Sequence, residues 1–288
     1  MFNKLFVFLT FILLPFASLP ADIVQITELE TILPSIEEGT LVLFNISEVL
    51  LDSKIELGTS KWRNSLRSDP NTILCHDWLT LLVAKKVPHK AVETSTPLLI
   101  QTLQAKGLPV MAFTSRGRSE WYNTKVEGVD ILTEQLLNKV GIDFTKSKLP
   151  ECFLALETSA DYSPYFHAGI LYASHLEKGE FLKKLLLDTQ FLPAKVVFVD
   201  DKKDSLVKVE KALLVLGIPN TCFWYTRTAV DHKNYDPNIA AVQLDKLLNQ
   251  DIILTNEEAA LESANREEQV KSLNKAIESL KAILRIQV

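Results

Sequence analysis

Three stretches of the chain are apolar at every position, without the alternation that marks a half-buried strand. They lie at residues 41–44, 110–113 and 196–199, and polar residues follow each of them. Continuous apolar runs of this length are typical of parallel strands that helices cover on both faces. Because ligands bind at the carboxyl ends of such strands, the polar residues that follow are candidate site residues.

Shorter strands and several helices are predicted around these runs. Further candidate strands lie at residues 152–156, 169–172 and 221–225. Several predicted helices stop at a glycine, as helix C-termini commonly do. The predicted helices are 23–38, 99–107, 131–140, 178–188 and 206–217. This succession of strands and helices predicts an α/β fold with a doubly wound parallel sheet.

Two segments fall outside the strand and helix succession of a domain at residues 22–250. Residues 53–106 are mostly helical and form a predicted insertion between the first two apolar runs. Residues 251–288 form an amphipathic tail, and we expect its helix to dock on the parent domain, with a dimer or protein-partner contact as the alternative. The apolar stripe of the tail comprises Val270, Leu273, Ile277, Leu280 and Leu284.

Residues 1–21 resemble a secretory signal peptide. Lys4 precedes an apolar core from Leu5 to Phe16, and small residues lead to a predicted cleavage after Ala21. The apolar core is shorter than the roughly 20 residues that a spanning helix needs, and Pro15 interrupts it. We therefore expect an exported protein, periplasmic or secreted, with no stable membrane span in its mature chain.

Composition excludes several classes of function. The formal net charge is -5 and no long basic block occurs, so nucleic acid is not an expected partner. Cys75, Cys152 and Cys222 form no C-x-x-C pair, and the five histidines show no metal-ligand spacing. Buried free thiols are expected at Cys152 and Cys222, although an exported protein also allows one disulfide. Adjacent residues on a helix point about 100° apart, so Cys75 and His76 are not a catalytic dyad.

The four apolar residues before Asn45, with Ser47 two positions later, resemble the first motif of the haloacid dehalogenase (HAD) superfamily of phosphohydrolases. In that superfamily two aspartates occupy these positions. The first attacks phosphorus and the second is the general acid and base. Here Asn45 stands at the nucleophile position and Ser47 at the acid/base position, so the first motif is degenerate.

The other three motifs of the superfamily have counterparts in the same order. Thr114, after the second apolar run, resembles the residue that hydrogen-bonds the phosphoryl group, and Lys178 resembles the third-motif lysine. The acids after the third run resemble the metal-binding motif, which implies a weak Mg²⁺ site that Asn45 would complete. These acids are Asp200, Asp201 and Asp204. The resemblance covers about residues 39–226 and implies an uncharacterised exported bacterial branch of the superfamily with a helical cap at the insertion.

Two arginines in the turn after Thr114 are candidate ligands for a substrate anion. They are Arg116 and Arg118, and a solvated loop is the alternative interpretation. A phosphorylated small molecule is the expected ligand class.

The degenerate first motif leaves two hypotheses for function. The amide of Asn45 is a far poorer nucleophile than a carboxylate, and the hydroxyl of Ser47 does not titrate near neutral pH. The favoured hypothesis is therefore a phosphatase-derived module that binds phosphate or metal, or acts as a scaffold, without turnover. The alternative is an active Mg²⁺-dependent phosphomonoester hydrolase that uses Glu48 or Asp52 as a rearranged acid. Glu48 is expected to point away from the site, because neighbours on an extended strand face opposite sides.

Overall fold

The computed structural model describes residues 23–118, 120–121, 124–153, 165–174, 176–262 and 266–284. The predicted signal peptide, residues 1–21, lies outside these ranges, as do residues 154–156 of one predicted strand.

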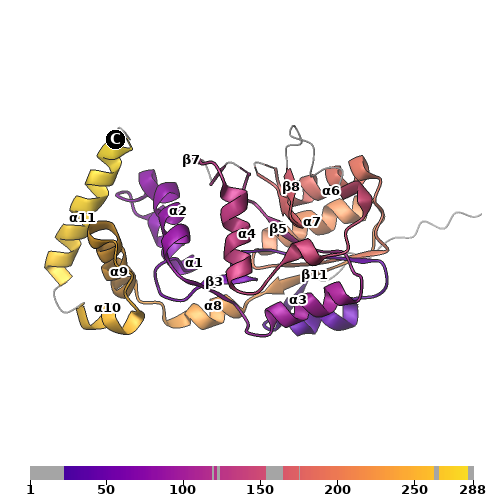
Figure 1. Cartoon of the computed structure of the whole chain (residues 1–288), viewed down its shortest axis with the longest axis horizontal. Coiled ribbons are helices and arrows are strands. Elements are labelled where there is room, and N and C mark those ends of the chain that lie inside the picture. The colour runs from indigo at the N-terminus through magenta and orange to yellow at the C-terminus, as the bar shows by residue number, and fades with distance from the viewer. Residues whose placement is uncertain are drawn as a thin grey trace, which may run out of the picture.

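A seven-stranded sheet forms the centre of the molecule, in the order β1-β11-β10-β2-β5-β9-β8 (Figure 1). All neighbouring strands are parallel except β8 and β9. The chain runs from β2 outward to β5 and β9, and then returns to place β10 on the other side of β2. This reversal next to β2 is a topological switch point, where ligands bind in open α/β sheets. The strands are β1 (Val24–Ile26), β2 (Thr40–Phe44), β5 (Val110–Thr114), β8 (Tyr165–His167), β9 (Ile170–Tyr172), β10 (Lys195–Asp200) and β11 (Asn220–Tyr225).

Helices cover both faces of the sheet, which explains the unbroken apolar runs. Val42 and Phe44 face one layer, whereas Leu41 and Leu43 face the other, and all four are fully buried. The first layer contains η1 (Leu29–Ser35), α3 (Thr96–Ala105), α4 (Val129–Lys139) and η3 (Phe144–Lys146). The second contains α6 (Lys178–Thr189) and α7 (Lys203–Val215). The α/β class and the mostly parallel central sheet agree with the sequence prediction.

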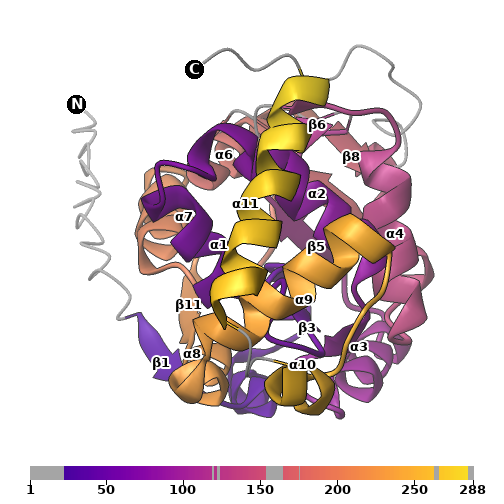
Figure 2. The same cartoon turned by 90° about the vertical axis from the view of Figure 1, so that its left-hand side faces the viewer.

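A separate helical layer stands beyond the carboxyl ends of the strands (Figures 1 and 2). Helices from the middle and the end of the chain share one hydrophobic cluster in it. The middle segment supplies α1 (Ser60–Ser68), η2 (Ile73–Cys75) and α2 (His76–Lys86). The end of the chain supplies α9 (Pro237–Gln250), α10 (Asn256–Glu262) and α11 (Arg266–Ile283). The sequence-predicted insertion is therefore divided, because α3 packs on the sheet and not in this layer.

The C-terminal helix α11 packs on the parent chain through its predicted stripe. Ile277 is buried in the cluster, and Leu273, Leu280 and Leu284 pack against it. Val270 and Ile283 stay exposed.

Two short antiparallel strand pairs and a short helix pair connect the layers. The β3–β4 pair (Leu51–Ser53 and His89–Ala91) carries the chain into and out of α1 and α2. The β6–β7 hairpin (Glu120–Trp121 and Thr124–Lys125) inserts Trp121 between α2 and α4. Helices α8 (Arg227–Asp231) and η4 (His232–Asn234) lead from β11 to α9.

The structure corrects two local predictions. The predicted helix at 23–38 is an edge strand, β1, followed by the 3-10 helix η1, which contains Pro34. Proline lacks a donor N–H, which favours such a short element over a long α-helix. Residues 151–153 are helical, so Cys152 does not lie in a strand.

No helix in the described part of the chain is both long and apolar enough to cross a membrane. Cys75, Cys152 and Cys222 are all free thiols, and Cys75 and Cys222 are buried.

Candidate functional site

Asn45 lies at the centre of a hydrogen-bond network at the carboxyl end of β2. Its backbone N–H donates to the carbonyl of Val199 at 2.8 Å, so the chain follows β10 for one residue beyond the strand. The side-chain Oδ1 accepts a bond from Nζ of Lys178 at 2.9 Å. The side-chain Nδ2 donates to Oδ1 of Asp201 at 2.7 Å and to the carbonyl of Ser47 at 2.8 Å. Three of the sequence-predicted site residues are therefore joined through one amide.

Lys178 reaches this network from the first turn of α6. Its ammonium group also lies 2.7 Å from Oδ2 of Asp200, and both side chains are almost completely buried. Burial lowers the pKa of Lys178, and the neighbouring carboxylate of Asp200 opposes that shift. Gly179 allows α6 to pack closely on α7, because a Cβ at residue 179 would lie 2.6 Å from the carbonyl carbon of Lys208. This close packing holds the first turn of α6, which carries Lys178. A side chain at residue 179 would push α6, and Lys178 with it, away from α7.

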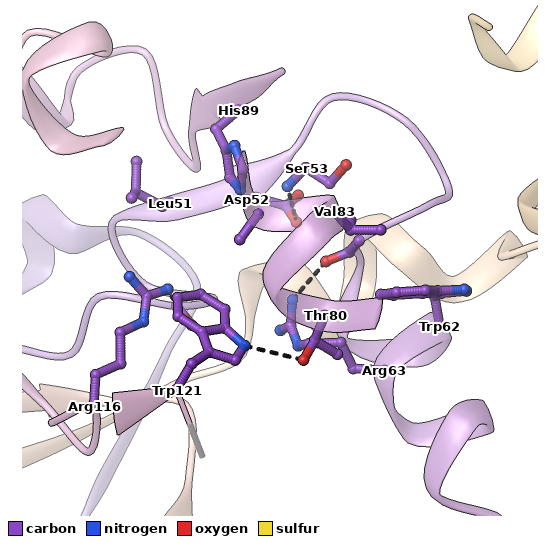
Figure 3. A pocket seen from close by; sticks show the side chains of 13 residues that line it. Leu51, Asp52, Ser53, Trp62, Arg63, Thr80, Val83, His89, Arg116 and Trp121 are labelled. Atoms are coloured by element: carbon purple, nitrogen blue, oxygen red, sulfur yellow. Dashed lines mark hydrogen bonds between the residues drawn. The ribbon is translucent and has the colours of Figure 1, made fainter. Parts of the chain in front are cut away.

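Thr114 and Arg116 form the opposite wall, at the end of β5. The hydroxyl of Thr114 accepts a bond from the backbone N–H of Arg116 at 3.2 Å. The guanidinium of Arg116 donates to Oγ of Ser47 at 3.3 Å and to Oγ1 of Thr133 at 3.0 Å. It also lies over the ring of Trp121, 4.6 Å from the centroid, as the close view shows (Figure 3). These contacts hold Arg116 beside Ser47, so the structure brings the first and second predicted motifs together.

Glu48 faces the site, which corrects the prediction that it points away. Strand β2 ends at Phe44, and Glu48 has a left-handed backbone with φ 67°, so the alternation of an extended strand no longer applies. Its side chain pairs with Arg63 of α1. The second carboxylate oxygen, Oε2, is buried and has no hydrogen-bond partner among the described residues. Burial, the charge of Asp200 and then that of Glu48 raise the pKa of Asp201 to about 7.

A pocket opens between the sheet and the helical layer, with about 860 Å³ of empty space that includes open solvent. The sheet side contributes Asn45, Ser47, Thr114 and Arg116, and helix α1 contributes Arg63 and Arg67. A second pocket, drawn in Figure 3, shares Ser47, Arg63, Arg116 and Trp121 with it and extends toward His89. Among the described residues that line the first pocket, four are basic and two acidic, so it favours an anionic ligand.

Four predicted site residues do not line this pocket. Lys178 and Asp200 are buried as an ion pair next to Asn45, whereas Asp204 and Arg118 lie away from that network. The side chain of Asp204 is 77% exposed and pairs with Lys208 one turn along α7, at 2.6 Å. It therefore lies on the exposed face of the first turn of α7, and the structure does not bring it to Asp200. Arg118 is half exposed and lies 3.5 Å from Asp130. Only Arg116 of the two predicted arginines reaches the site.

With this geometry established, comparison with known proteins identifies the family. A family model described as "Protein of unknown function (DUF2608)" matches residues 22–260. The chain belongs to this DUF2608 family. It is 28% identical over 235 residues to a "Putative outer membrane protein" of Chlamydia trachomatis, covering 78% of this chain and 82% of that protein. It is 22% identical over 251 residues to "Uncharacterized protein RP296" of Rickettsia prowazekii, covering 84% and 89%. No solved structure matches the chain.

This DUF2608 protein also contains a buried ion-pair group that the sequence did not predict. Nε2 of His232 lies 2.9 Å from Oδ2 of Asp52, and Nζ of Lys90 lies 3.6 Å from the same oxygen. Donor atoms of Glu48, Asp52 and His232 all lie within 4.8 Å of one another, a spacing that could hold a metal ion. However, Arg63 and Lys90 already balance the two carboxylates, so we interpret the group as a charge network. Because 180 residues separate His232 from Asp52, no local spacing could reveal it.

Proposed function

We propose that this protein binds phosphate or a phosphomonoester in the pocket at the carboxyl end of β2 and does not hydrolyse it. The observation that carries the proposal is the position of Asn45. A neutral amide stands where a phosphohydrolase of the HAD type would have its attacking carboxylate, and the residues around it keep the polar groups of a phosphate site.

The arrangement of the other motifs supports a relationship to that superfamily. The residues that resemble its four motifs come from the ends of β2, β5 and β10 and from the start of α6. Asn45, Thr114 and Asp201 line one pocket, and Lys178 bonds Asn45 and Asp200 beside it. Thr114 and Arg116 supply donors to an anion, and Lys178 supplies a buried positive charge. The helical layer formed by α1 and α2 would then act as the cap over the ligand.

The absence of turnover follows from the chemistry of two side chains. The single oxygen of the Asn45 amide is a poor nucleophile, and it already accepts a hydrogen bond from Lys178. The hydroxyl of Ser47 cannot donate a proton to a leaving group near neutral pH. Its oxygen also accepts a hydrogen bond from Arg116.

A second candidate function, a phosphomonoester hydrolase, is favoured by one observation on Glu48. Its carboxylate lines the pocket and has an oxygen without a hydrogen-bond partner among the described residues, so it is available to act as a base. Asp52, the other acid considered, is less suitable. Both of its oxygens accept hydrogen bonds, from Ser53 N–H and from His232, and its side chain is 1% exposed.

We also propose that the protein acts outside the bacterial cytoplasm. The Chlamydia relatives are each named "Putative outer membrane protein", which supports an exported or cell-envelope location. The apolar segment from Leu5 to Phe16 supports the same location.

Calorimetric titration of the mature chain with inorganic phosphate tests the proposal, together with a phosphatase assay on generic phosphomonoesters. Arg116→Ala should weaken phosphate binding by about tenfold or more, because a charge-assisted hydrogen bond is lost. Arg118→Ala is the matched control, since it removes the same charge two residues away and outside the pocket. Equal loss in both variants, or no phosphate binding at all, would contradict the proposal. Hydrolysis that Glu48→Gln abolishes would favour the second candidate.

A further inference from the structure

The amide nitrogen of Asn45 stands between two oxygen atoms that a divalent cation would need. Nδ2 lies 2.7 Å from Oδ1 of Asp201 and 2.8 Å from the carbonyl oxygen of Ser47. A carboxylate and a backbone carbonyl are typical ligands of Mg²⁺. Here both oxygens accept hydrogen bonds from the NH₂ group instead.

The orientation of this amide follows from Lys178. The ammonium group of Lys178 can only donate, so it requires the oxygen of Asn45 on its side, at 2.9 Å. Turning the amide over would place NH₂ against the ammonium group and the oxygen against two other oxygens. Three hydrogen bonds would then be lost around Asn45 and Lys178, which are both buried.

A carboxylate at position 45 could serve Lys178 and a cation at the same time, because it has two oxygens. The amide has only one oxygen and therefore cannot do both. The other two acids of the fourth motif do not compensate for this loss. Oδ2 of Asp200 is held by Lys178, Oδ1 accepts the backbone N–H of Lys202 at 2.9 Å, and Asp204 points into solvent. The donor set of this site does not fit Mg²⁺.

From this geometry we propose that the site works without a divalent cation, and that the NH₂ group of Asn45 replaces it as the link between Asp201 and the turn at Ser47. Positive charge for a bound phosphate then comes from side chains of the chain itself, chiefly Arg116 and the other basic residues that line the pocket. The part of this inference that concerns phosphate rests on the proposed function. The part that concerns metal does not.

Thermal unfolding of the full mature chain in EDTA and in millimolar Mg²⁺ tests the metal part. The unaltered protein should unfold at the same temperature in both. In Asn45→Asp a second oxygen faces Asp201 and Ser47, so this variant should unfold about 3 °C or more lower in EDTA and recover in Mg²⁺. Asn64→Asp is the matched control, because it adds the same charge at an exposed position of the same pocket, and no hydrogen bond joins Asn64 to Asp201 among the described residues. It should show no recovery specific to Mg²⁺.

A saturable Mg²⁺ stabilisation of the unaltered protein that Asp201→Asn removes would overturn the inference. That comparison also decides whether the unaltered site binds Mg²⁺ if Asn45→Asp fails to fold.

Titration with inorganic phosphate in the same two buffers tests the phosphate part. Equal affinity in EDTA and in Mg²⁺ is the expected result. Affinity that rises about tenfold in Mg²⁺ would overturn the inference while leaving the proposed function intact. Absence of phosphate binding in both buffers would overturn the proposed function, and the thermal comparison would still decide whether the site takes a metal.

Discussion

Nε2 of His232 lies 2.9 Å from Oδ2 of Asp52, although the two residues are 180 positions apart. This bond joins the β3–β4 strand pair to the segment that leads into α9, and it lies close to Glu48. Replacing His232 by Gln keeps a donor but removes the positive charge. We expect a loss of about 2 kcal/mol in the free energy of unfolding, the size of a hydrogen bond to a charged group.

The same variant should show that the contribution of His232 to stability depends on pH. Burial lowers the pKa of His232, but the hydrogen bond to Asp52 and the charges of Asp52 and Glu48 outweigh it, so the net pKa is raised. The contribution of a group with a raised folded pKa is complete below its unfolded pKa, about 6.5, and is lost as the pH rises through the folded value. The difference in stability between the unaltered protein and His232→Gln should therefore be larger at about pH 6 than at about pH 9. Urea unfolding at the two pH values measures it. His167→Gln, at a half-exposed pair 4.0 Å from Glu134, should show little change and serves as the control.

His89 should give the opposite dependence of stability on pH. Burial and then the charge of Arg116 lower its pKa to about 4, and its Nδ1 is buried with no hydrogen-bond partner in the described part of the chain. The stability that depends on neutral His89 is complete above the unfolded pKa and is lost as the pH falls from about 6.5 to 4. The expected loss is about 3 kcal/mol.

Comparison of the unaltered protein with His89→Gln isolates this contribution, because the other titrating groups cancel in the difference. The variant should be less sensitive to acid between about pH 6.5 and pH 4 in urea unfolding. Parallel stability curves for the two proteins over that range would show that His89 is not held neutral by its surroundings.

The central sheet could be predicted because burial on both faces leaves a strong signal in the sequence. Strands β2, β5 and β10 are buried at almost every position, so each appears as a continuous apolar run. Strand β1 was missed because it is a three-residue edge strand with only Ile26 buried. Its pairing with β11 is a contact between the two ends of the domain, which local pattern does not encode.

The candidate site was predictable where a residue lies at the carboxyl end of a strand or, as for Lys178, at the start of a helix. Asn45 directly follows β2 and Asp200 ends β10, and the parallel pairing of these strands brings the two residues together. Glu48 was misplaced because its direction depends on a positive φ in the turn. Arg63 and His232 reach the site region from the helical layer and from the end of the chain, and tertiary packing alone places them there.

Gly179 should be a position where a single methyl group disrupts the site. A Cβ at this residue would collide with the backbone of Lys208, so α6 would have to move away from α7. We expect Gly179→Ala to destabilise the protein by about 3 kcal/mol, as overpacking of a close contact does.

Gly217→Ala is the matched control for this change. Residue 217 has φ 68°, and a Cβ there would meet nothing within 4 Å, so only backbone strain of about 1 kcal/mol is expected. Urea unfolding compares the two variants. If Gly179→Ala costs no more than Gly217→Ala, the close approach of α6 and α7 is not needed to hold Lys178 in place.

The double variant Asn45→Asp with Ser47→Asp should gain phosphatase activity. The choice of substrate separates the contribution of the new nucleophile from that of the new proton donor. Asn45→Asp restores a carboxylate nucleophile, whereas Ser47→Asp restores a proton donor for the leaving group. The phenolate of an aryl phosphate with an acidic phenol is a good leaving group without protonation. On that substrate the activity of the single variant Asn45→Asp should therefore approach that of the double variant. An alkyl phosphate needs the proton, so the double variant should exceed the single one by about 10²–10⁴-fold.

The position of Arg116 sets a limit on that gain. Its guanidinium already lies 3.3 Å from the hydroxyl of Ser47, so it would pair with a new carboxylate at that position and favour the ionised form. An acid that is held ionised is a weaker proton donor, and the gain on alkyl phosphates should therefore fall toward the lower end of the expected range. Initial rates with and without Mg²⁺, on one aryl and one alkyl phosphomonoester, measure all of these effects. A double variant that folds, binds phosphate and still hydrolyses neither substrate would show that the site lacks more than its two acids, and would leave binding as the chemistry that this pocket retains.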